Sequence, residues 1–71
     1  MHILILGAAG MLGRKLTAAI TGGALAYDRL TLADVVAPAV VSGTTSLAVN
    51  LTEAGAADLL IKDRPDLIFH L

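Results

Sequence analysis

A short apolar run that leads into three evenly spaced glycines constrains the fold of this chain more than any other feature. The run covers residues 2–6, the glycines are Gly7, Gly10 and Gly13, and an amphipathic segment follows them directly. This order predicts a buried parallel strand, a tight turn and a helix that begins among the glycines. Unpaired amides and the positive end of the helix dipole converge at such a turn, which makes it a site for phosphate.

Each glycine has a separate expected role. Gly7 permits the sharp turn, Gly10 lets a pyrophosphate approach the backbone, and Gly13 lets the helix pack closely against the sheet. The spacing is G-x-x-G-x-x-G, with Ala9 inside it, and no Gly-Lys-Ser/Thr sequence occurs, which excludes a P-loop. A plain strand-to-helix turn without a ligand is the alternative, but the flanking strand and helix favour nucleotide binding.

The remaining pattern predicts strands and one further helix in alternation. The expected elements are a helix over 11–20 ended by Gly22 and Gly23, a strand over 30–33, a loop over 35–45, a strand over 46–49, a helix from 51 or 52 to 62, and a strand over 67–71. Parallel pairing with right-handed crossovers gives an α/β fold, half of a doubly wound sheet with strand order 3-2-1-4.

The first helix is expected to bury one apolar stripe against this sheet. The stripe would hold Met11, Leu12, Leu16, Ala19 and Ile20, with Arg14, Lys15 and Thr17 toward solvent. In the second helix the residues at helical spacing are Ala56, Leu59 and Leu60.

Composition indicates part of a larger body. Of the 71 residues, 56% are hydrophobic and 15% are charged, against about 25% charged in typical soluble domains. The last strand would leave an apolar sheet edge bare, so we expect missing chain or self-association there. Residues 1–71 are therefore interpreted as a partial domain, with the rest of that domain and a substrate domain absent.

Charge and residue types exclude several classes of function. The net charge of −1, without a basic stripe, argues against nucleic acid as a partner. No cysteine is present, and the start of the chain lacks the basic residues of a signal peptide, which together fit a cytoplasmic chain. No membrane-spanning helix is expected, and neither His2 nor His70 has a second ligand at metal spacing.

Two polar residues follow strands and are candidates for binding. Asp34 ends the second strand, where a carboxylate can accept both ribose hydroxyls of an adenosine and would repel a 2′-phosphate, which favours NAD over NADP. A solvated strand-end acid is the alternative. Asn50 ends the third strand and either faces adenine, its amide oxygen accepting from the exocyclic amine, or closes a turn. His70 is expected to be a packed core histidine.

These residues resemble a known family. Gly7 to Gly13, Asp34, Asn50-Leu51 and Phe69-His70-Leu71 look like the opening of an extended short-chain dehydrogenase/reductase. The sequence segments 13–17 and 30–38 resemble those of the NAD-dependent epimerase/dehydratase branch, near nucleotide-sugar epimerase-like proteins and D-erythronate dehydrogenases. The family usually has Asp where Asn50 stands. The resemblance implies a partial NAD-binding Rossmann domain.

The resemblance also implies roles for individual residues. The amides of Met11 and Leu12 would meet the pyrophosphate, beside Gly7, Gly10 and Gly13, and Asp34 would hold the ribose. Asn50 and Leu51 would border the adenine, and Leu71 would begin the loop that passes the cofactor.

No catalytic residue is expected in this chain. The family's catalytic Ser/Thr and its Tyr-x-x-x-Lys pair have no candidate in these 71 residues. We therefore expect the NAD-binding N-terminal portion of an NAD-dependent sugar or sugar-acid epimerase or dehydrogenase, without turnover of its own. A non-catalytic dinucleotide sensor or interaction module is the alternative.

Overall fold

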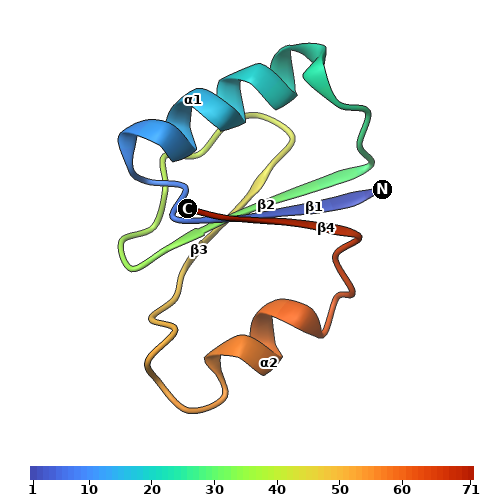
Figure 1. Ribbon diagram of the computed structural model, residues 1–71. Coiled ribbons are helices and arrows are strands. Elements are labelled where there is room, and N and C mark those ends of the chain that lie inside the picture. Colours follow the sequence, from blue (N-terminus) through green and yellow to red (C-terminus); the bar gives the residue numbers. More distant parts are fainter.

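Four parallel strands form one sheet in the order β3-β2-β1-β4 in the computed structural model, which describes residues 1–71. The strands are β1 (His2–Leu6), β2 (Arg29–Asp34), β3 (Thr45–Ala48) and β4 (Leu67–His70). Helices α1 (Met11–Ala19) and α2 (Ala56–Ile61) lie on opposite faces of the sheet (Figure 1). This is the expected half of a doubly wound, Rossmann-like α/β fold, and the predicted strand order is confirmed.

The central strand β1 is buried on both faces, as its continuous apolar sequence predicts. Ile3 and Ile5 belong to the cluster beneath α1, whereas Leu4 belongs to a smaller cluster beneath α2. The larger cluster also holds Ala8, Ile20, Leu30 and Leu32. Because successive side chains of a strand point to opposite faces, β1 contributes to both cores.

The prediction of which α1 residues face the sheet is wrong in part. The buried residues are Gly13, Thr17 and Ile20, Leu16 is half-buried, and Met11, Leu12 and Ala19 are exposed. A Cβ atom at Gly13 would lie only 2.3 Å from the carbonyl oxygen of Gly7, so the helix contacts the turn through this glycine. That contact fixes the rotation of α1 and brings Thr17, one turn on, to the sheet, where its hydroxyl donates to the Gly13 carbonyl at 2.7 Å.

Gly22 and Gly23 lie at the end of the helical segment, as predicted, but the segment extends past them to Ala24. A single turn, η1 (Ile20–Ala24), continues the helix, and Gly23 adopts φ +111° within it. The glycines therefore end the helical segment, a few residues beyond the predicted end.

Helix α2 is shorter than predicted. Gly55 immediately precedes it with φ +81°, a left-handed conformation that keeps residues 51–55 out of the helix. Leu60 packs into the smaller cluster, but Leu59 is 50% exposed and does not join the buried stripe. Strand β3 begins one residue earlier than expected, and residues 35–44 form the predicted loop without helix or strand.

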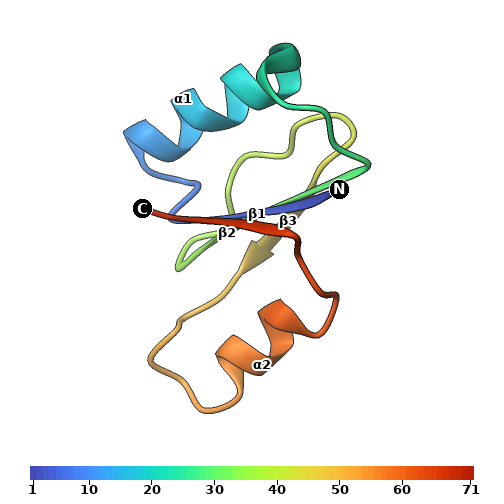
Figure 2. The same ribbon diagram turned by 45° about the vertical axis from the view of Figure 1, so that its right-hand side comes forward.

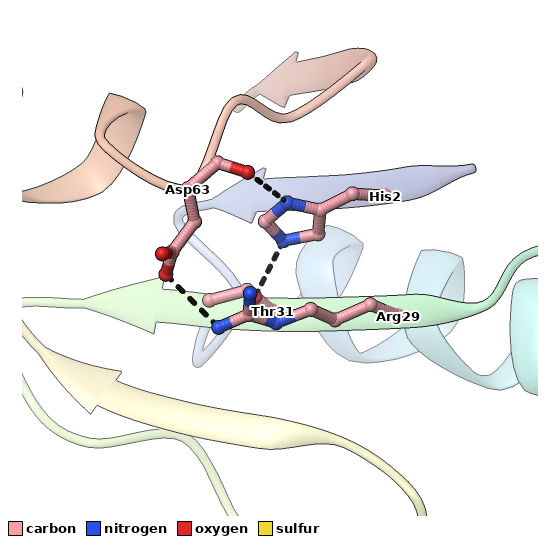
Figure 3. A network of polar contacts seen from close by, with 4 residues as sticks. All are labelled: His2, Arg29, Thr31 and Asp63. Atoms are coloured by element: carbon pink, nitrogen blue, oxygen red, sulfur yellow. Dashed lines mark hydrogen bonds and ion pairs between the residues drawn. The ribbon is translucent and has the colours of Figure 1, made fainter.

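A polar network ties α2 to the amino ends of the strands (Figure 3). One ring nitrogen of His2 (Nε2) lies 2.8 Å from the buried Thr31 hydroxyl, and the other (Nδ1) lies 3.4 Å from the carbonyl oxygen of Asp63. The Arg29 guanidinium pairs with the Asp63 carboxylate at 2.9 Å. The network anchors the segment after α2 to the amino ends of β1 and β2, at the opposite end of these strands from the glycine turn.

Strand β4 forms an edge of the sheet (Figure 2). Ile68 and His70 are exposed, so the prediction of a packed core histidine at position 70 is wrong. These two side chains alternate with the half-buried Leu67 and Phe69, which pack against the cluster beneath α1. Neither helix of the structure has the length and apolar character needed to cross a membrane.

Candidate functional site

The turn between β1 and α1 is held against the end of β2. The amides of Gly7 and Ala8 both donate to the carbonyl oxygen of Ala33, at 2.9 and 3.1 Å. Gly7 has φ +86°, and a Cβ there would meet the Leu71 carbonyl oxygen at 3.0 Å, so glycine satisfies both the conformation and the space. The sharp turn expected of Gly7 is therefore observed.

Gly10 differs from the other two glycines. Its backbone is extended with φ −74°, a conformation open to any residue, and a Cβ would meet only the Gly7 carbonyl oxygen, at an ordinary contact distance of 3.6 Å. A Cβ at Gly13, by contrast, would overlap the backbone of Gly7 and Ala8. The fold thus accounts for glycine at positions 7 and 13 and leaves position 10 without a structural reason.

The amino end of α1 presents free backbone donors. None of the amides of Met11, Leu12 and Gly13 has a hydrogen-bond acceptor within the protein, and Gly10 provides no side-chain cap. Met11 and Leu12 are also exposed. Unpaired amides at a helix N-terminus, together with the helix dipole, favour an anionic group at this point.

Asp34 is bound to the glycine turn and is not a free solvated acid. One carboxylate oxygen (Oδ2) accepts from the amide of Ala9 at 2.9 Å, and the other (Oδ1) accepts from the amide of Val35 at 2.7 Å. A carboxylate oxygen has two lone pairs, so each oxygen still has one for a hydroxyl donor. The structure therefore joins the β2 carboxylate to the turn 25 residues before it.

A hollow of about 270 Å³ opens at the carboxyl edge of the sheet, beside this carboxylate. Five of the predicted site residues line it together: Gly7, Asp34, Asn50, Leu51 and Leu71. The other four, Gly10, Met11, Leu12 and Gly13, form the helix start and are connected to the hollow through the bond between Ala9 and Asp34. The hollow is lined mainly by apolar side chains with few polar groups, as is usual for small-molecule sites.

Sequence reasoning missed several residues of the hollow. Val35 and Val49 form part of its apolar wall, and Leu60 reaches it from α2. His70 lines it as well, although the sequence placed this histidine in the core. Alternation along β4 was the available signal, since residue 70 shares a face with Ile68 and not with Phe69.

Asn50 closes a turn after β3 and also lines the hollow. Its side-chain oxygen accepts from the Thr52 amide at 3.0 Å and from the Thr52 hydroxyl at 2.7 Å. Asn50 therefore closes a turn, which was one of its two predicted roles, and it does so beside the hollow where the adenine was expected. No three histidine or acidic side chains come together in an arrangement that could hold a metal ion.

A comparison with solved structures gives one strong similarity. The chain superposes on the nucleoside-diphosphate-sugar epimerase from Agrobacterium tumefaciens with a TM-score of 0.88 and 41% sequence identity. The match covers 99% of this chain and 23% of the epimerase chain, so the chain spans about a quarter of that protein's length. No protein-family model and no curated protein matches the sequence. The chain is thus an α/β half-fold that is similar to an epimerase in both structure and sequence.

Proposed function

We propose that this chain is the NAD-binding N-terminal portion of an NAD-dependent epimerase or dehydrogenase that acts on a nucleotide sugar or sugar acid. The similarity to a nucleoside-diphosphate-sugar epimerase supports the enzyme class. The chain's own residues support the binding role. They provide the half of the site that would hold the adenosine diphosphate of the cofactor.

The observation that carries the proposal is that position 10 is glycine although the fold has room for a side chain there, next to helix amides that have no acceptor. The fold tolerates a side chain at this position, since a Cβ would make one ordinary contact. The adjacent amides of Met11 and Leu12 have no acceptor. A pyrophosphate explains both facts, because it needs close approach to the backbone and supplies the missing acceptors.

Asp34 supports an adenosine ribose as the neighbouring group. Its two oxygens are fixed in place by the Ala9 and Val35 amides and keep lone pairs toward hydroxyl donors. A negative charge at this point disfavours a 2′-phosphate, so NAD is the expected cofactor. When bound in a complete enzyme, NAD supplies the hydride acceptor, and these residues hold and orient its adenosine end.

Calorimetric titration of the 71-residue chain with NAD, ADP and NADP tests the proposal. ADP is expected to bind about as tightly as NAD, because these residues contact only the shared half, and NADP is expected to bind more weakly. Asp34→Asn removes the charge and is expected to weaken ADP binding about tenfold or more, since hydrogen bonds to charged groups contribute about 1.5–3 kcal/mol.

Asp58→Asn is the matched control. Asp58 lies in the first turn of α2 and takes no part in the hollow, so the same change there is expected to leave ADP affinity unaltered. No heat with either NAD or ADP, or equal ADP affinity in the Asp34→Asn variant and the unmodified chain, would contradict the proposal.

A further inference from the structure

Asn50 has a side-chain amide of which only one end is used by the protein. The oxygen accepts two hydrogen bonds from Thr52, one from its amide and one from its hydroxyl. A carbonyl oxygen has two lone pairs, so both are occupied. The amide nitrogen, with two N–H donors, has no acceptor among the hydrogen bonds of the structure.

The orientation of this amide is dictated by chemistry. A backbone N–H can only donate, so the Asn50 atom that faces the Thr52 amide has to be the oxygen. The nitrogen is then the other terminal atom of the planar amide group, bonded to the same carbon as the oxygen. Asn50 is exposed and lines the hollow together with Asp34, so the two free donors are available to a molecule bound there.

We propose that Asn50 positions the purine base by donating a side-chain N–H to one of its ring nitrogens. This inference rests on the proposed adenosine site and changes the expected chemistry of the contact. The sequence suggested that the Asn50 oxygen accepts from the exocyclic amine of adenine. Since Thr52 already occupies that oxygen, the site recognises an acceptor on the base and does not require the amine.

The walls of the hollow fit a base held in this way. Val35, Leu51 and Leu60 are apolar and line the same hollow as Asn50. A planar base can rest against such side chains while one polar group fixes its orientation.

Nuclear magnetic resonance of the 15N-labelled chain tests the inference directly. Asn50 is the only asparagine and the chain contains no glutamine, so a single carboxamide NH2 pair is present in the whole molecule. The probes are ADP and its 6-desamino analogue, purine riboside 5′-diphosphate, which keeps every ring nitrogen and lacks the exocyclic amine. Both are expected to shift this NH2 pair, and their affinities are expected to agree within about threefold.

Two variants separate the donor from the turn. Asn50→Ser keeps a side-chain oxygen for the Thr52 amide and loses the NH2 group, so it is expected to weaken both ligands equally, by about two- to tenfold. Asn50→Asp keeps the shape and replaces the donors by an acceptor. It is expected to weaken the desamino analogue more than ADP, because a carboxylate can still accept from the adenine amine.

The possible failures are distinguishable. If ADP binds but the NH2 pair does not shift, or if the unmodified chain binds the desamino analogue tenfold more weakly than ADP, the inference is overturned and the adenosine site stands. If neither ligand binds a chain that circular dichroism shows to be folded, the proposed function itself is refuted together with the inference.

Discussion

Replacing Gly10 and Gly13 in turn by alanine separates the residue that the fold needs from the residue that the ligand needs. Both lie in the same turn, three residues apart, and both changes add one methyl group. At Gly13 the new Cβ would lie 2.3 Å from the Gly7 carbonyl oxygen and 2.6 Å from the Ala8 Cα. At Gly10 the nearest atom would be 3.6 Å away.

The expected losses of stability differ accordingly. Alanine inside a helix normally stabilises by about 1 kcal/mol relative to glycine. At Gly13 that gain is opposed by overlap with two backbone atoms that cannot rotate away. Overpacking costs about 1–3 kcal/mol, and the severity of this overlap favours the upper end of that range, so we expect a net loss of about 2 kcal/mol. For 71 residues the total stability is about 4–11 kcal/mol, so such a loss is a large share.

Gly10→Ala is expected to change stability by less than about 1 kcal/mol. The reduced entropy of the unfolded chain favours alanine, whereas the N-cap position slightly disfavours it, and the two effects are of similar size. Its effect falls on the ligand. A methyl group at the proposed pyrophosphate position is expected to weaken ADP binding about tenfold or more.

Urea unfolding followed by circular dichroism, and ADP titration of each folded variant, measure the two effects. The reasoning is refuted if Gly13→Ala unfolds at the same urea concentration as the unmodified chain. It is refuted equally if Gly10→Ala destabilises as much as Gly13→Ala, or if it binds ADP with unchanged affinity.

Three further predictions concern the stability of the half-fold, each measured by urea unfolding. Leu60→Ala is expected to cost about 2–3 kcal/mol, since Leu60 is the largest buried side chain of α2 and is 6% exposed; an unchanged midpoint would show that α2 does not pack on the sheet. His2→Ala is expected to cost about 1–3 kcal/mol because it leaves the buried Thr31 hydroxyl without its partner, and the double variant with Thr31→Val should recover part of that loss. The Met1 amino group donates a hydrogen bond to Asp28, which raises the pKa of the amino group above its ordinary 8.0 and lowers the pKa of the Asp28 carboxyl below 3.8. The exposed pair therefore stabilises the fold slightly between pH 3.8 and pH 8.0. This stabilisation is lost as the pH rises through the raised pKa of the amino group or falls through the lowered pKa of Asp28. Asp28→Asn should therefore differ from the unmodified chain near pH 6 and converge with it at pH 11 and pH 2.

The sequence was sufficient to predict the sheet because local pattern and topology rules agree. Residues 2–6 are apolar without alternation, which indicates a strand buried on both faces and not one with a solvent-exposed face. The glycines that follow predict a turn into a helix. Right-handed crossovers then leave one strand order, which the structure has. Asp34 could be placed at the turn for the same reason, since parallel neighbouring strands end at the same edge.

The rotation of α1 could not be obtained from periodicity. Met11 and Leu12 are apolar and at suitable spacing, but the contact of Gly13 with the turn decides which face meets the sheet. That contact is between backbone atoms, so no scale of side-chain hydrophobicity contains it. The extent of α2 was missed for a similar reason, because the left-handed conformation of Gly55 depends on the path of residues 51–55.

The adenosine side of the proposed site is arranged within these residues before any ligand arrives. Ala33 accepts from the amides of Gly7 and Ala8, and Asp34 accepts from Ala9, so two consecutive residues of β2 hold three consecutive residues of the turn. A turn fixed in this way loses little conformational freedom on binding, which favours affinity. The same bonds make the proposed ribose and pyrophosphate positions depend on one another, because displacing the Asp34 carboxylate would release the Ala9 amide beside Gly10. Loss of ADP affinity in an Asp34 variant therefore measures both the lost ribose contact and the loosened turn.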